Sequence, residues 1–155
     1  MNIFVLDRDP AIAASMACDK HVVKMILETA QMLCTAAREA GHYAPYRSTH
    51  KKHPCTIWAG ESKENWDWLV SHGLALCAEY TSRYGKKHKS QAIIEWCRDN
   101  PVGPQEGLLT PFRQAMPNKY KSTDPVKSYR DYYIGEKSAF AVWAHSETPS
   151  WWKKE

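Results

Sequence analysis

The chain has 155 residues, of which 43% are hydrophobic and 25% are charged. This balance is typical of an ordinary folded protein and excludes an intrinsically disordered one, and the length favours a single domain over residues 1–155. The formal net charge of +4 is compatible with a nucleic-acid partner without requiring one. No apolar stretch approaches the length of a membrane-spanning helix, so we expect no membrane partner.

The spacing of apolar and capping residues predicts a mainly α fold, in which three to four main helices form one compact domain. Residues 2–6 are expected to form an extended apolar arm that is threaded between those helices. Asp-Pro pairs at 9–10 and 124–125 are typical of helix starts, and Asp19 is expected to cap the longest helix. The expected helices cover about residues 10–17, 19–40, 54–58, 63–84, 90–98 and 126–143. Four prolines and two glycines predict irregular structure over residues 100–117.

The helix over residues 19–40 is the element around which the rest is organised. At 100° per residue, Val22, Ile26, Ala30 and Leu33 share one face. Apolar residues fill most of the remaining circumference as well, so the helix is expected to be central and buried on several sides. One narrow polar stripe nevertheless follows it, at steps of three, four and three residues, and consists of His21, Lys24, Glu28 and Gln31.

Two interpretations of this stripe are open. In the first, Lys24 and Glu28 form a simple ion pair on an exposed helix edge. In the second, which we favour, the stripe lines the floor of a site. Glu28 is then the acid/base group, His21 and Lys24 are its cationic neighbours, and Lys24 and Gln31 contact nucleic acid.

A basic segment precedes the short helical turn at Pro54. We predict that it contacts phosphates, whereas a merely solvated loop is the alternative. Its residues are His50, Lys51, Lys52 and His53.

A metal site is the remaining alternative for this segment. His50, His53 and Cys55, joined by Cys18 and His21, contain zinc-ligand chemistry. Their spacing matches no structural zinc pattern, and we therefore predict no metal and no other cofactor. The five cysteines are scattered along the chain, which predicts reduced and mostly buried thiols, as in an intracellular protein.

The end of the chain is aromatic and basic. Trp151 and Trp152 are followed by Lys153 and Lys154, in a chain that is rich in aromatic residues, with seven tryptophans and eight tyrosines. Stacking of the tryptophans on a distorted or extrahelical base, with the lysines near phosphates, is the functional interpretation. Packing of both rings in the core is the alternative.

These motifs resemble the pyrimidine-dimer DNA glycosylase/AP lyase family, of the bacteriophage endonuclease V type and its bacterial relatives. That family opens its central helix with Asp-x-His and has a catalytic Glu seven residues after the His, as do Asp19, His21 and Glu28 here. The Thr-Pro-Ser-Trp-Trp-Lys end at 148–153 is similar to a Pro-Thr-Trp-Tyr-Lys segment that the family associates with lesion binding.

The bacterial branch is more similar still. It has a Lys-x-x-x-Glu-x-x-Gln-x-Leu core, which Lys24, Glu28, Gln31 and Leu33 reproduce, and a later His-Pro before a Trp, like the His-Pro pair at 53–54 here. Arginines flank the catalytic Glu in the phage enzyme, and Leu27 and Gln31 stand at those places in this chain.

The resemblance implies a compact helical fold in which the N-terminal arm ends at the active site. It also implies that an N-terminal α-amine attacks C1′ of the damaged nucleotide and forms a Schiff base, while Glu28 assists sugar opening and β-elimination. Residue 2 is Asn, a poor context for removal of the initiator methionine, so the amine is expected to belong to Met1, with Asn2 as the alternative. An α-amine suits this role because its ordinary pKa near 8 leaves a useful unprotonated fraction at neutral pH.

The implied partner is double-stranded DNA with a damaged or modified base, bound by an intracellular monomer. Two other classes of function stay open. One is a non-catalytic nucleic-acid-binding module on the same fold. The other is a metal-dependent nuclease or metal-stabilised domain that uses His50, His53 and Cys55.

Overall fold

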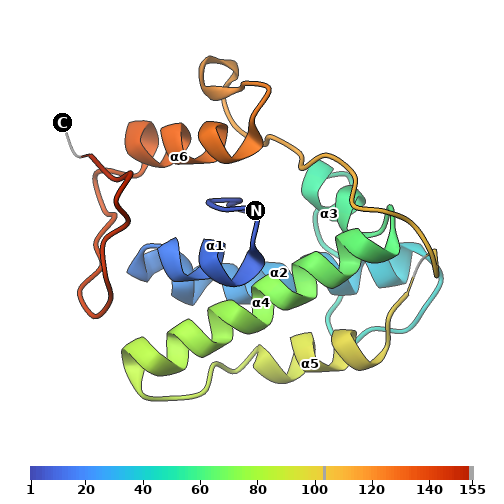
Figure 1. Ribbon diagram of the computed structural model, residues 1–155. Coiled ribbons are helices and arrows are strands. Elements are labelled where there is room, and N and C mark those ends of the chain that lie inside the picture. The colour runs from blue at the N-terminus through green and yellow to red at the C-terminus, as the bar shows by residue number, and fades with distance from the viewer. Residues whose placement is uncertain (103, 154–155) are drawn as a thin grey trace.

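The computed structural model describes residues 1–102 and 104–153, and every regular element in these residues is helical (Figure 1). The predicted mainly α fold is therefore confirmed. The helices are α1 (Pro10–Met16), α2 (Asp19–Glu39), α3 (Pro54–Ala59), α4 (Lys63–Tyr84), α5 (Gln91–Asp99) and α6 (Pro125–Glu136), with a short 3-10 turn η1 at Asn118–Tyr120. The described part of residues 100–117 is irregular, as expected. Gly103 and Lys154 lie outside the described residues.

Helices α2 and α4 form the centre of the fold. Helix α4 packs against α1, α2 and α5, and α2 also packs against α3 and α5. Helix α6 lies on the opposite side of the N-terminal residues, which pass between it and the α1, α2 and α4 layer (Figure 1). The arm at residues 2–6 is buried along its whole length, so its threading between helices is confirmed.

Four of the six α-helices in the described residues begin with a side-chain cap, whereas α2 and α5 do not. Asp9 accepts hydrogen bonds from Ala11 N and Ile12 N, and Asp124 accepts one from Val126 N, as an N-cap carboxylate does. Asp19 was expected to cap α2 in the same way, and this was wrong.

Asp19 is the first residue of α2 and its carboxylate serves tertiary contacts. One oxygen lies 3.2 Å from Arg83 Nη1, and the other accepts a hydrogen bond of 2.8 Å from Ala144 N. The Arg83 side chain is almost fully buried, so the carboxylate neutralises a cation that would otherwise be costly to bury.

The last helix is shorter than predicted, because α6 ends at Glu136 and not near residue 143. Beyond it the chain turns back toward the start of α2. The Trp143 indole donates to Met16 O at 3.0 Å, and Val142 O accepts from Asp19 N at 2.9 Å. These contacts need a reversal of the chain, which a continued helix does not allow.

The central helix is buried on most sides but not on all. Val22, Ile26, Ala30 and Leu33 are completely buried, as their shared face predicted. Val23 and Leu27 are 41% and 42% exposed, so the expectation of burial on every apolar side was wrong on that face.

All five cysteines are free and buried, as predicted. In the part of the chain that the structure describes, no helix has the length and apolar character needed to cross a membrane.

Candidate active site

The most unusual contact in the structure joins the start of the chain to the middle of α2. The Met1 amine lies 3.0 Å from Glu28 Oε1, and the Glu28 side chain is only 11% exposed. Within the described residues, Glu28 Oε1 accepts no hydrogen bond from any side chain or interior backbone group, so the amine is its ionic partner. Burial of a carboxylate is costly without a cation nearby, and the chain supplies that cation as its own α-amine.

The direction of the arm explains how the amine reaches Glu28. The Phe4 ring stacks on His21 at 4.3 Å, and Met1 meets Glu28, so the arm runs antiparallel to α2. Three extended residues span about 10 Å, and the seven helical residues from His21 to Glu28 rise by about the same distance. The arm therefore has the length needed to bring the amine to the carboxylate.

The Met1 side chain does not obstruct its own amine. That side chain is 3% exposed, whereas the residue as a whole is half-buried, so the accessible part of Met1 is its backbone. The sulfur lies 3.8 Å from Thr56 Oγ1 of α3. The thioether is held in the fold, away from the Met1 backbone that meets Glu28.

Asn2 fixes the residue that follows. Its side-chain amide donates to Ala115 O at 2.8 Å, and its Oδ1 accepts from the Tyr129 hydroxyl at 2.9 Å. The Cys55 thiol contacts the same oxygen at 3.6 Å. The arm is thus tied to α3, to α6 and to the irregular segment before η1. Sequence reasoning missed the anchoring role of Asn2, Thr56 and Tyr129, although a polar residue that opens an apolar run is a signal for such an anchor.

His53 is the sequence-predicted loop residue that the structure brings to the amine. Its Nδ1 accepts a hydrogen bond of 3.1 Å from Cys55 N at the start of α3, so the neutral ring carries its proton on Nε2. Burial and the nearby Met1 amine lower the pKa of His53, whereas Glu28 and a hydrogen bond to the Met1 backbone act in the opposite direction. A neutral imidazole therefore lies beside the amine and the carboxylate.

The other residues of the basic segment lie outside this centre. His50, Lys51 and Lys52 are exposed in the turn before α3. His50 has a φ of 50°, a left-handed conformation that non-glycine residues adopt rarely. These three side chains are therefore exposed to solvent in the strained turn that immediately precedes His53.

Lys24 and Gln31 flank Glu28 on the open side of α2. Lys24 Nζ is 3.8 Å from Glu28 Oε2, and the Lys24 side chain is 62% exposed. Gln31 is half-buried and, with Lys24, lines a surface groove. The predicted stripe is therefore divided, because Lys24 and Gln31 face this groove whereas His21 and Glu28 face the arm.

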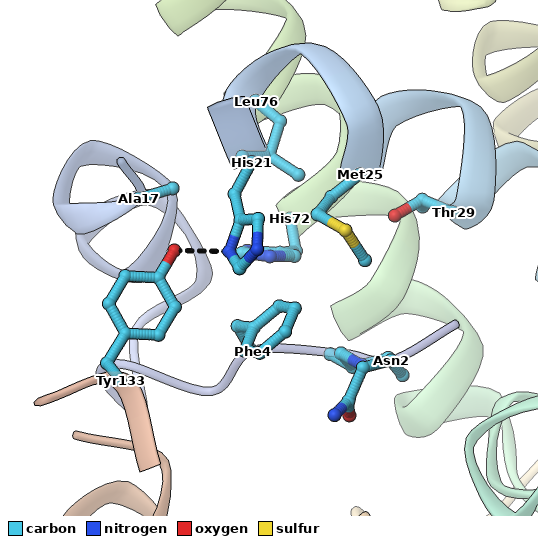
Figure 2. Close-up of a pocket in the computed structure, with 10 residues that line it drawn as sticks. Asn2, Phe4, Ala17, His21, Met25, Thr29, His72, Leu76 and Tyr133 are labelled. Carbon is cyan, nitrogen blue, oxygen red and sulfur yellow. Dashed lines mark hydrogen bonds between the residues drawn. The ribbon is translucent and has the colours of Figure 1, made fainter. Parts of the chain in front are cut away.

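His21 is not a cationic neighbour of Glu28, and that prediction was wrong. Its Nδ1 lies 2.6 Å from the Tyr133 hydroxyl, and Phe4 covers the ring (Figure 2). Burial, followed by the nearby Lys137, lowers the pKa of His21 to about 3, so the ring is neutral. The cavity that His21 lines with Phe4 and His72 measures about 10 Å³, which is far too small for a base or a sugar.

The tail does not lie near the amine either. Trp151 and Trp152 are half-buried and pack edge-on against Tyr133, and the Trp151 indole contacts Met16 Sδ at 3.3 Å. They cover the His21 end of α2 in turns, not in a helix. Lys153 is exposed beyond them.

The alternative metal set is not assembled. In residues 1–102 and 104–153, no three His, Cys, Asp or Glu side chains are grouped as metal ligands. Cys55 faces Asn2, and burial raises the pKa of its thiol to about 11, so it is not a thiolate near neutral pH.

A family model described as pyrimidine dimer DNA glycosylase matches residues 1–92, which is more than half of the chain. The chain belongs to this family. The match contains the arm, α1 to α4, and the Met1, Glu28 and His53 group, and it confirms the resemblance seen in the sequence motifs. Comparison with curated proteins and with solved structures finds no match. In the broad sense, this member of the pyrimidine dimer DNA glycosylase family is a DNA-repair glycosylase whose substrate is DNA.

Proposed function

We propose that the protein excises damaged or modified pyrimidines from double-stranded DNA and then cleaves the abasic strand, with the Met1 amine as nucleophile and Glu28 as acid/base group. The observation that carries the proposal is the 3.0 Å approach of the amine to a carboxylate that is almost buried. A nucleophile and a base within hydrogen-bond reach are the minimum arrangement for covalent catalysis.

The chemistry follows from these two groups. The neutral amine attacks C1′ of the damaged nucleotide, the bond from C1′ to the base breaks, and the base leaves with its electron pair and takes up a proton. The amine proton lost on attack passes to Glu28, which returns it to O4′ as the sugar ring opens to a protonated imine. The regenerated Glu28 carboxylate then takes a proton from C2′, and the electron pair of that C–H bond expels the 3′ phosphate and cuts the strand.

Lys24 is a weaker candidate for the nucleophile. Its ammonium is farther from Glu28, at 3.8 Å, and its side chain is 62% exposed and free to move. The Met1 amine is closer to the carboxylate. Asn2 fixes the arm that carries it, because both the nitrogen and the oxygen of its side-chain amide form hydrogen bonds. Preorganisation of this kind favours the α-amine.

His53 acts in this proposal as a positioning residue. It caps α3 through Nδ1 and lies close enough to the Met1 amine and to Glu28 for both to act on its pKa. The exposed His50, Lys51 and Lys52 are proposed to contact phosphates at the entrance, where cations bind DNA without reading its sequence.

Borohydride trapping tests the proposal. The full-length protein is incubated with UV-irradiated duplex, with an abasic duplex and with undamaged duplex, and the adduct is mapped by peptide mass spectrometry. We expect a covalent adduct on the first two substrates, attached to the peptide that begins at Met1. An intact-mass measurement establishes that Met1 is present in the same preparation.

Three controls sharpen the result. Glu28→Gln is expected to lose trapping, whereas Glu39→Gln, an exposed residue of the same helix, is the matched control that retains it. A few residues added before Met1 should abolish trapping, because they remove the amine from its place. An adduct on Lys24, or full trapping by the extended protein, would refute the role of the α-amine. DNA binding with no adduct on any substrate would leave a binding module on the same fold.

A further inference from the structure

A groove of about 760 Å³ lies beside the candidate active site, on the exposed face of α2. Its floor consists of Val23 and Leu27, the two apolar residues of this helix that remain about two-fifths exposed. The chain segments 46–49 and 88–90 form its walls. Lys24 belongs to the groove and approaches Glu28 Oε2 at 3.8 Å, so the groove begins next to the carboxylate.

The first wall is held rigidly against α2. Arg38 donates hydrogen bonds to Tyr46 O at 2.7 Å and to Ala44 O at 2.6 Å. One turn earlier in α2, the Thr35 hydroxyl donates to Thr49 O at 3.1 Å and accepts from Thr49 N at 3.0 Å. The segment from 44 to 49 is therefore fixed at both ends.

The second wall is fixed just as firmly. His88 donates from Nε2 to Val23 O at 3.1 Å and accepts from Ser90 N through Nδ1 at 3.0 Å. A hydrogen bond of 2.9 Å between the Tyr46 and Ser90 hydroxyls ties the two walls together. Because both nitrogens of His88 are used in this way, its role is structural, and the groove is preformed.

The charge of the groove has a single sign. Lys24, Arg47 and Lys89 supply three exposed cations, and the described residues that line the groove include no Asp or Glu. Arg47 and Lys89 form no ion pair with any carboxylate of the described residues. Two unpaired cations above an apolar floor make a surface that attracts an anion with flat or apolar parts.

We propose that this groove is a strand-binding site, in which Arg47 and Lys89 hold phosphates of the DNA strand that leads away from Glu28, while sugar or base faces rest on Val23 and Leu27. This deepens the function proposed above and rests on it for the choice of DNA. The groove is open to solvent, and Lys24, which lines it, lies 3.8 Å from Glu28 Oε2. A positively charged groove that follows the phosphate backbone binds nucleic-acid strands with little sequence preference.

Salt-dependent binding tests the proposal. Fluorescence anisotropy measures the affinity of the full chain for a duplex that carries a stable abasic analogue, over a series of salt concentrations. The Arg47→Ala/Lys89→Ala protein should lose about two units from the slope of log affinity against log salt, and bind about 10- to 100-fold more weakly at low salt. Arg47→Lys/Lys89→Arg keeps both charges and should restore most of the slope.

A matched control distinguishes the loss of the groove cations from a general loss of positive charge. Arg98→Ala/Lys121→Ala removes the same two charges at exposed sites outside the groove, and its slope should stay close to that of the unchanged protein. A slope that falls equally in both double variants, or in neither, would overturn the proposal. Circular dichroism and thermal unfolding verify that each variant is folded.

The experiments distinguish failure of the groove proposal from failure of the proposed catalytic function. The same titrations are run in the Glu28→Gln protein, where binding is measured without turnover. A groove-specific loss of slope, combined with no trapping by the unchanged protein, would refute the catalytic proposal and support the groove. Normal trapping with no groove-specific change in slope would refute the groove and support the catalytic proposal. Failure of the unchanged protein to bind the duplex would refute both.

Discussion

Helix α2 presents two ionisable side chains to the same arm, about two turns apart, and their surroundings are opposite. His21 is sealed by Phe4 and hydrogen-bonded to Tyr133, and its lowered pKa of about 3 keeps it neutral. Glu28 meets the Met1 amine at 3.0 Å and has an exposed lysine on its other side. At 100° per residue the two side chains point in nearly the same direction, so their positions on the helix do not separate them.

The arm separates them. Its apolar part covers His21 with an aromatic ring, and its charged end lies over Glu28. A histidine under a phenyl ring and a tyrosine is a structural residue, because its charged form is excluded. A carboxylate opposite an amine at the edge of a groove is placed for the proton transfers proposed above. What lies over a residue thus decides between a structural and a chemical role.

The largest expected difference between the two ends is in catalysis. Glu28→Gln should reduce single-turnover strand cleavage by about 10² to 10⁴-fold, because the amide cannot accept the amine proton. His21→Gln should retain cleavage at a temperature where the protein is folded. Rapid-quench assays on UV-irradiated and abasic duplexes measure both rates. Equal losses in the two variants would place His21 in the catalytic group.

Acid pH should lower stability through the buried histidines beside Phe4, His21 and His72. Burial lowers the pKa of His21 to about 3 and that of His72 to about 4, whereas both titrate near 6.5 when unfolded. The unfolded chain therefore binds more protons below pH 6.5, and the free energy of unfolding falls as the pH drops from 6.5 toward 4. Through these two residues, the free energy of unfolding should fall by about 4 kcal/mol between pH 7.5 and pH 5.

Urea unfolding at a series of pH values measures this dependence. His72→Gln should remove about half of the slope, since one of the two buried neutral rings is gone. A flat profile between pH 7.5 and pH 5 in the unchanged protein would show that both rings take up protons in the folded state.

A smaller effect is expected from the hydroxyl that closes the sealed end. Tyr133→Phe leaves the buried His21 Nδ1 without its partner at 2.6 Å, which should cost about 1–3 kcal/mol of unfolding free energy. Tyr43→Phe is the control, since Tyr43 is 70% exposed and its loss should change stability by less than about 0.5 kcal/mol. Urea midpoints measure both. Equal shifts would mean that the His21–Tyr133 contact is not stabilising.

The smallest effect on stability is expected beside Glu28, where the surface is open to solvent. Lys24→Ala removes an ion-pair partner that is 62% exposed and 3.8 Å from Glu28, so the free energy of unfolding should change by less than about 1 kcal/mol. Urea unfolding at low and at high salt measures the change, which should shrink further as salt rises. A loss of several kcal/mol would show that Lys24, and not the Met1 amine, is the main partner of Glu28.

Interactions between residues close in the sequence explain why much of the fold could be predicted from it. The Asp9 and Asp124 caps and the buried face of α2 depend on residues within one or two turns of each other, and these predictions hold. The Asp-x-His and Glu spacing on α2 is equally local, and it led to the family that the match over residues 1–92 confirms. Predictions failed where a distant segment intervenes, as when Arg83 and Ala144 take the Asp19 carboxylate from its expected cap.

The sequence by itself determined the helices, the arm and the place of Glu28 on α2, because periodicity and capping act over a few residues. Only the tertiary structure decided which polar residues of α2 are sealed and which are open. The pairing of the Met1 amine with Glu28 and the burial of His21 under Phe4 depend on where the arm lies. The groove walls at 46–49 and 88–90 depend on hydrogen bonds to α2 that span many residues. Such contacts leave no periodic signal, because the partners meet only when the chain is folded.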